Sequence, residues 1–163
     1  MIGFPNPVNE KAARVVAGGV LLLSALTLTL SAVDRGWLWL TVPLAYGFVA
    51  RVLTGPRLSP LGQLATRVVA PRLGEPKLVA GPPKRFAQTI GAVVTLTAVL
   101  LVALGADTGA RALLVVMVVF ATLESVFALC VGCKVFAGLM RLGVVPVEVC
   151  EACNDISGRW AAA

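Results

Sequence analysis

The run VVAGGVLLLSALTLTLSAV, residues 15–33, contains no charged residue. Its length is close to the roughly 20 residues that a helix needs to cross about 30 Å of hydrocarbon. Three further apolar runs lie at about 37–53, 87–104 and 112–129. Because only short turns join the first run to the second and the third to the fourth, each pair should form an antiparallel hairpin. The sequence therefore predicts an all-α, integral membrane four-helix bundle.

The composition supports a membrane protein rather than a soluble one. Of the 163 residues, 58% are hydrophobic and only 13% are charged, whereas soluble domains carry about 25% charged residues. No change of composition divides the chain, so we expect a single membrane domain over residues 1–163. The first run is too long for the apolar core of a signal peptide, and we expect it to remain as an uncleaved anchor.

The distribution of positive charge predicts the orientation in the membrane. The chain has 14 lysines and arginines and a net charge of +6. Only Arg35 and Arg111 lie in the two short turns, and the other 12 lie beside the termini or in the middle loop. By the positive-inside rule, both termini and the middle loop should be cytoplasmic. This distribution explains the basic charge without nucleic acid, and we expect no nucleic-acid partner.

Two segments on the predicted cytoplasmic side contain helix start signals. Asn6 is placed to cap the first helix, with Pro7 at its first position. In the middle loop, residues 54–86, Ser59 is placed to cap a short helix that begins at Pro60. Its apolar residues recur at helical spacing, which favours an amphipathic helix in the membrane interface. A loop helix packed on the bundle is the alternative.

All the cysteines lie in the last part of the chain, as two C-x-x-C pairs separated by sixteen residues. The four residues are Cys130, Cys133, Cys150 and Cys153. Both pairs are expected in a short Cys-rich cytoplasmic tail, residues 130–163. This spacing is within the range of zinc sites, in which four thiolates hold one tetrahedral ion. Because cytosolic thiols are normally kept reduced, permanent disulfides are not expected. An iron–sulfur cluster is a further alternative.

The same four cysteines also fit catalytic thiol redox or persulfide transfer. Expected at the C-terminal end of the fourth span, Cys130 and Cys133 would face the negative end of the helix dipole, which disfavours a thiolate. The second pair has acidic neighbours, which also disfavour a thiolate. Neither pair is therefore predicted to be a fast nucleophile without a metal.

Glu124 lies within the fourth apolar run, about 9 Å of helix before Cys130. A carboxylate at that depth is costly unless it is paired or faces a cavity, and it is a candidate functional residue. Arg14 and Arg51 lie at the same side of the membrane and are the candidate partners. The residues Glu124, Arg14 and Arg51 are thus predicted to form an intramembrane charge cluster. This cluster either clamps the bundle or assists the thiols.

Five blocks of the sequence resemble a bacterial membrane protein family catalogued as domain of unknown function 4395. They are FPNPVNEKAARV (4–15), LTGPRLSPLGQLA (53–65), GPPKRFAQTIG (81–91), LESVFALCVGC (123–133) and VCEACN (149–154). The resemblance implies four spans, a place in the bacterial cytoplasmic membrane and no established activity. Genes of the family often lie near those of thioredoxin-like proteins and rhodanese-type sulfurtransferases, which implies a cytosolic partner of one of these kinds.

The leading functional hypothesis is thiol-dependent redox or sulfur handling at the cytoplasmic face. A structural or interaction protein with a four-cysteine zinc site is the first alternative, and zinc is its expected cofactor. A small transporter of a sulfur species is the second, in which case a cavity should extend past Glu124 toward the far side. Whether the protein is an enzyme stays open at this stage.

Overall fold

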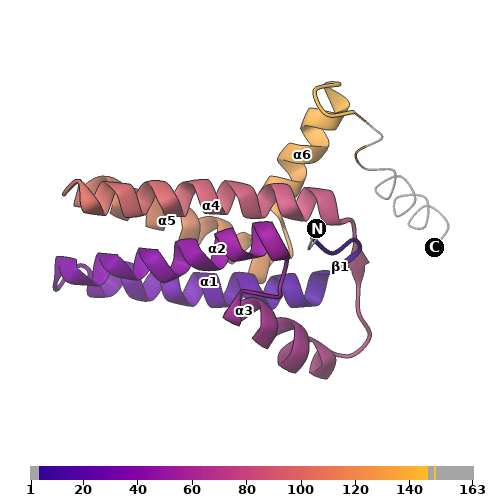
Figure 1. Ribbon diagram of the computed structural model, residues 1–163, viewed down its shortest axis with the longest axis horizontal. Helices are drawn as coiled ribbons and strands as arrows, with labels where there is room; N and C mark the ends of the chain where they lie inside the picture. Colours follow the sequence, from indigo (N-terminus) through magenta and orange to yellow (C-terminus); the bar gives the residue numbers. More distant parts are fainter. Residues whose placement is uncertain (1–3, 147–148, 150–163) are drawn as a thin grey trace.

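Four long helices lie side by side in the computed structural model, which describes residues 4–146 and residue 149 (Figure 1). They are α1 (Glu10–Leu30), α2 (Thr41–Thr54), α4 (Gly81–Ala103) and α5 (Asp107–Ser125). A 3₁₀ turn, η1 (Arg35–Leu40), precedes α2 and lengthens it toward the far end of the bundle. All four, counting η1 with α2, are long and apolar enough to cross a membrane, as the sequence predicted.

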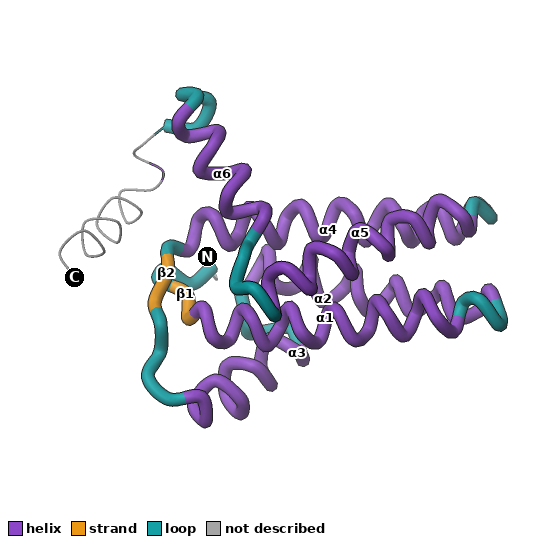
Figure 2. The backbone as a smooth tube through the Cα atoms, turned by 180° about the vertical axis from the view of Figure 1, so that it is seen from behind, coloured by secondary structure: helices purple, strands orange, loops and turns teal. Residues whose placement is uncertain are grey.

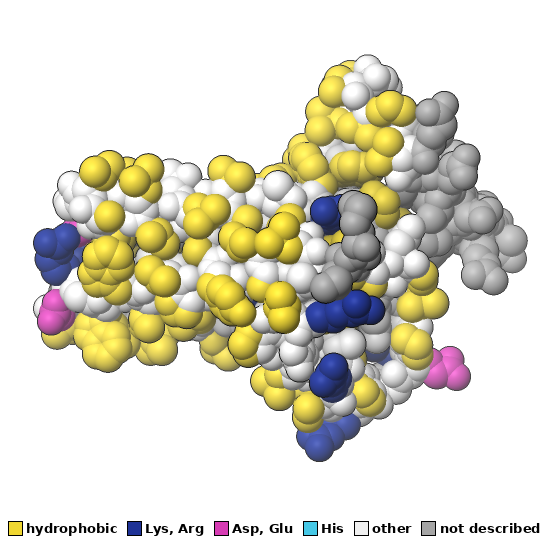
Figure 3. All heavy atoms as spheres, viewed as in Figure 1, with side chains coloured by type: hydrophobic (Ala, Val, Ile, Leu, Met, Phe, Trp, Pro, Cys, Tyr) yellow, Lys and Arg dark blue, Asp and Glu magenta, His cyan; other side chains and the backbone are white. Residues whose placement is uncertain are grey.

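The side chains of the bundle are distributed as expected for a protein surrounded by lipid. Leucines and valines such as Leu22, Val93 and Leu100 are exposed on its outside, and Figure 3 shows apolar side chains along its length. Hydroxyl residues such as Thr27 and Thr95 are instead buried, and each donates to a backbone carbonyl of its own helix, at 2.7 Å. Small and hydroxyl residues between helices allow close packing in a membrane.

The main helix contacts join one hairpin to the other. α1 packs mainly on α5, and α2 packs mainly on α4. Gly91 on α4 lets the Phe48 ring of α2 lie directly against the helix backbone, since a Cβ at position 91 would clash with that ring. The half of the bundle that ends in the turns between α1 and η1 and between α4 and α5 is the far half. It is filled by an apolar cluster of Leu38, Val102, Ala110 and Leu114.

The start of α1 differs from the sequence prediction. Asn6 is not the N-cap: its Oδ1 accepts from the Gly81 backbone N–H at 3.0 Å and ties the N-terminal segment to the start of α4. Asn9 caps α1 instead, accepting from Lys11 N–H at 3.0 Å. Asn9 and the residue before it form the strand β1 (Val8–Asn9). This strand pairs antiparallel with β2 (Leu78–Val79), as Figure 2 shows.

The capped helix of the middle loop is confirmed. Ser59 Oγ accepts from Gly62 N–H at 3.2 Å, and α3 (Pro60–Gln63) begins at Pro60. The helix continues as a π segment, η2 (Leu64–Val69), and a 3₁₀ turn, η3 (Ala70–Leu73). Ala65 is fully buried in the core shared with α1, whereas Leu64 and Val68 stay exposed. One side of this segment thus packs on the bundle, and its other side presents apolar groups outward.

The sequence predicted that the fourth span continues to Leu129, but the helix ends earlier. α5 ends at Ser125, and a separate helix, α6 (Val131–Arg141), leaves the bundle at an angle (Figure 1). It packs on α4, where the Phe136 ring contacts the Phe86 ring in a tilted arrangement, with centroids 5.5 Å apart. This break decides where the first cysteine pair lies.

Candidate dithiol site

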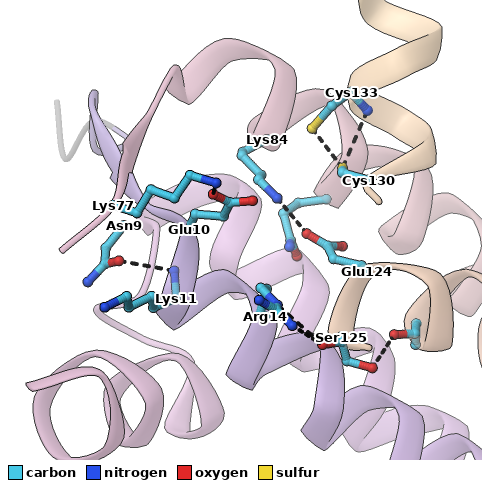
Figure 4. Close-up of polar contacts among 12 residues, drawn as sticks. Asn9, Glu10, Lys11, Arg14, Lys77, Lys84, Glu124, Ser125, Cys130 and Cys133 are labelled. Atoms are coloured by element: carbon cyan, nitrogen blue, oxygen red, sulfur yellow. Dashed lines mark hydrogen bonds and ion pairs between the residues drawn. The ribbon is translucent and has the colours of Figure 1, made fainter. Parts of the chain in front are cut away.

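An arginine of α1 donates hydrogen bonds to the carbonyls at the C-terminal end of α5. Arg14 Nη2 donates to Ser125 O at 3.0 Å, as Figure 4 shows, and to Val126 O at 3.3 Å. These carbonyls have no partner in the helix, because the last turn of any helix leaves its acceptors unsatisfied. Ala128 then takes a left-handed conformation, with φ 56°, that turns the chain. Such a φ costs a non-glycine residue roughly 1–2 kcal/mol, so the break needs outside support.

Cys130 is the N-cap of α6. Its Sγ accepts from Cys133 N–H at 3.4 Å, and the Cys130 carbonyl accepts the first helical bond, from Lys134 N–H. The prediction that this pair faces the negative end of a helix is therefore wrong. Because α5 and α6 are separate helices, Cys130 and Cys133 lie at the start of α6, where the helix dipole is positive and favours a thiolate.

The two thiols of the pair are placed differently. Cys130 is 9% exposed, and Cys133 is partly exposed. Their sulfurs lie 2.7 Å apart, with the Cys133 thiol donating to Cys130 Sγ (Figure 4). This hydrogen bond lowers the pKa of Cys130 against the opposing effects of burial and of Glu124, and the positive charge of Lys84 acts in the same direction. The same hydrogen bond, together with burial, raises the pKa of Cys133. The N-cap position and these pKa directions thus favour negative charge on Cys130 and a proton on Cys133.

The cation beside Glu124 is Lys84. Lys84 Nζ lies 2.7 Å from Glu124 Oε1, and Lys84 is only 7% exposed. Figure 4 shows this ion pair directly beside the two thiols. Among the described residues, the direct ion pair of Glu124 is with Lys84 rather than with Arg14 or Arg51. Both arginines donate hydrogen bonds to other groups, and Arg51 interacts with Glu124 only through its charge. Lys84 lies in the first turn of α4, and a lysine buried in a span needs an acidic partner.

Arg51 joins three helices near the same end of the bundle. Its Nε donates to Gln88 Oε1 on α4 at 2.8 Å, and its Nη1 donates to Ser59 Oγ at the start of α3 at 3.1 Å. The guanidinium also lies 4.5 Å from the centroid of the Phe48 ring. The cation–π contact and these two hydrogen bonds make Arg51 a clamp between helices, and its charge also interacts with Glu124 at a distance.

Two cavities meet at Cys130. One, of about 470 Å³, lies on the outer side and is also lined by Lys84, Cys133 and Lys134. The other, of about 190 Å³, lies within the bundle and is lined by Glu124 and mainly apolar side chains. Cys130 therefore lies between an outer cavity with charged lining residues (Glu10, Lys84 and Lys134) and an apolar inner one.

The second cysteine pair, Cys150 and Cys153, lies outside the described residues. Within residues 4–146, no group of three or more cysteine, aspartate, glutamate or histidine residues is arranged to hold a metal ion. The four-cysteine zinc site thus stays a prediction, with only its first half placed.

The fold defines a multi-pass helical membrane protein, and the site adds a C-x-x-C pair at the start of a helix that follows the last span. The chain belongs to the family described as Domain of unknown function (DUF4395), whose model matches residues 8–141. The resemblance seen in the sequence is thereby confirmed. The matched region contains Lys84, Glu124 and the first cysteine pair, and it ends before Cys150. No curated protein and no solved structure matches the chain.

The Lys84–Glu124 pair should be a strongly coupled unit. Because the partner left behind is a buried charge, we expect Lys84→Met or Glu124→Gln to lower the free energy of unfolding by about 3 kcal/mol. The double variant should lose much less than the sum of the two, in a double-mutant cycle measured in detergent. The exposed Arg35–Asp107 pair at the far end is the control, with coupling of about 1 kcal/mol or less. Strictly additive losses for Lys84 and Glu124 would show that they do not interact.

The hydrogen bond from Cys133 should set the reactivity of Cys130. In protein with Cys150→Ser and Cys153→Ser, we expect Cys133→Ala to raise the pKa of Cys130, because the thiolate loses its donor. The pH profile of iodoacetamide alkylation at Cys130 should shift to higher pH. Cys133→Ser keeps a hydroxyl donor and should shift the profile less. Identical profiles for wild-type and Cys133→Ala protein would contradict the assignment.

Proposed function

We propose that the protein is a membrane-embedded thiol redox protein, in which Cys130 and Cys133 cycle between a dithiol and a disulfide. The observation that carries this proposal is the place of Cys130 at the N-cap of α6, with the Cys133 thiol 2.7 Å from its sulfur. A C-x-x-C pair at a helix start, with one lowered thiol pKa, is suited to thiol–disulfide exchange.

The exchange would follow the roles that the geometry gives the two thiols. Cys130 thiolate attacks one sulfur of a partner's disulfide, and the partner's other sulfur leaves as a thiolate. Cys133 then loses its proton and attacks Cys130 Sγ, which releases the partner as a dithiol and leaves a Cys130–Cys133 disulfide. The protein is oxidised by two electrons and the partner is reduced by two, and the reverse sequence restores the protein dithiol. Alternatively, the same Cys130 thiolate would attack the outer sulfur of a sulfurtransferase's cysteine persulfide, so that the sulfur passes to Cys130 and the donor cysteine leaves as a thiolate.

The outer cavity supports a soluble, cytosolic partner. Lys134 lines it beside both thiols, and its charge would favour an approaching thiolate or an acidic surface. Figure 3 shows lysine and arginine side chains grouped at the end of the bundle that carries α3 and β1. By the positive-inside rule this end is cytoplasmic, where thioredoxin-like proteins and rhodanese-type sulfurtransferases provide candidate partners.

The transporter alternative has less support. The inner cavity does extend past Glu124, and its deepest lining residues, Val20 and Met117, lie midway along α1 and α5. The far half of the bundle is filled by the cluster around Leu38 and Leu114. A pocket closed at mid-depth favours binding over passage.

The experiment compares cysteine variants that are purified with reductant and then freed of it. Cys133→Ser should trap a mixed disulfide through Cys130 when the protein meets an oxidised thioredoxin-like protein, since the resolving thiol is missing. Cys130→Ser should trap far less. Protein with Cys150→Ser and Cys153→Ser should still form a reversible Cys130–Cys133 disulfide, identified by mass spectrometry after maleimide blocking.

A metal analysis of the same samples can contradict the redox proposal directly. About one zinc per chain, lost with either cysteine pair and accompanied by unreactive thiols, would reject the redox proposal and favour the four-cysteine zinc site. Absence of any mixed disulfide from the Cys133→Ser protein would also count against it.

A further inference from the structure

The inner cavity has the size and lining of a site for an apolar ring. Its volume is about 190 Å³, and an apolar cavity of about 150 Å³ is enough to bind benzene. Side chains of α1, α2, α4 and α5 form most of its wall. The polar residues of the wall are Gln88, Glu124 and Cys130.

The cavity also reaches the outer surface of the bundle. Phe120 on α5 and Val135 on α6 both line it, and they are 39% and 46% exposed. Phe120 belongs to a candidate membrane span, so the opening beside it faces lipid when the protein is in a bilayer. A ligand dissolved in the membrane can therefore enter without crossing water.

We propose that this cavity binds the ring of a membrane quinone and that the Cys130–Cys133 dithiol reduces it. The inference rests on the proposed redox function and names its membrane partner. A dithiol that exchanged electrons only with soluble proteins would need no apolar cavity behind its nucleophile. Quinones are lipid-soluble two-electron acceptors with a ring of the size this cavity admits.

The reaction balances within the groups present. The Cys130 and Cys133 thiols together lose two electrons and two protons and become joined by an Sγ–Sγ bond. The quinone takes up two electrons and two protons and leaves as a quinol.

The polar residues of the cavity wall are placed to bind a quinone carbonyl and to exchange protons with water. Arg51 Nε donates to Gln88 Oε1, so the Gln88 NH₂ group is the end of the amide left to donate to a quinone carbonyl. Glu124 lines the inner cavity, and its partner Lys84 lines the outer one. The ion pair thus connects the quinone site with the water side, where protons are exchanged.

A single-turnover measurement tests the inference. Pre-reduced protein with Cys150→Ser and Cys153→Ser is freed of reductant and mixed anaerobically with decyl-ubiquinone or, separately, with a short-chain menaquinone analogue. We expect about one quinol per chain, with loss of both remaining thiols, since the couple transfers two electrons. The arm that reacts faster identifies the quinone class.

Cavity variants separate this reaction from thiol exchange. Ala121→Leu fills the cavity from α5, and Val135→Trp closes its exposed mouth without changing the core. Each should slow quinol formation about tenfold or more, because the ring no longer contacts Cys130, while exchange with the thioredoxin-like protein is kept. Val115→Leu, exposed on the same helix and away from the cavity, is the control.

The contrary results are distinct. Thiol exchange without quinol formation overturns the quinone site and leaves the proposed function in place, whereas loss of both reactions in unaltered protein overturns both. Quinol formation at the wild-type rate in Val135→Trp and Ala121→Leu protein also overturns the site. So does a phospholipid that copurifies in the cavity and is not displaced by the quinone.

Discussion

The hydrogen bonds from Arg14 to the carbonyls of Ser125 and Val126 are the constraint on which the candidate site depends. They satisfy acceptors that a continuing helix would have used, and they hold the end of α5 against α1. With that end fixed, the chain can pass through the left-handed Ala128 and begin a new helix at Val131. Without the break, Cys130 and Cys133 would lie on a helix with no free N–H groups around their sulfurs.

The break brings three kinds of chemistry to one place. A helix start and a thiol donor stabilise charge on Cys130, a buried ion pair lies beside it, and an apolar cavity lies behind it. Each element has a cost in a membrane, where polar groups must be satisfied within the protein. The bundle meets that cost by pairing Lys84 with Glu124 and by clamping Arg51 between Gln88 and Ser59. The site is thus the part of the fold where polar groups are concentrated.

The spans and the Ser59 cap were predictable from the sequence, since apolar length and capping chemistry are local properties. The end of α5 was not, because no glycine or proline lies between Ser125 and Cys130 to mark it, and the left-handed residue there is an alanine, Ala128. The role of Glu124 was half predicted: its depth required a cation, but choosing Lys84 over Arg14 and Arg51 needed the helix packing. The role of Asn6 was missed because its partner, Gly81, is distant in the sequence.

The most direct test of the account is the reactivity of Cys130 when Arg14 is replaced. In protein with Cys150→Ser and Cys153→Ser, Arg14→Ala should slow alkylation of Cys130 about tenfold, because α5 can then extend and the helix start is lost. Arg111→Ala is the matched control, since Arg111 Nη2 donates to the Ser31 carbonyl at the end of α1 on the far side, at 2.7 Å. It should leave Cys130 unchanged. An unchanged alkylation rate in folded Arg14→Ala protein would contradict the claim that this break makes the thiol reactive.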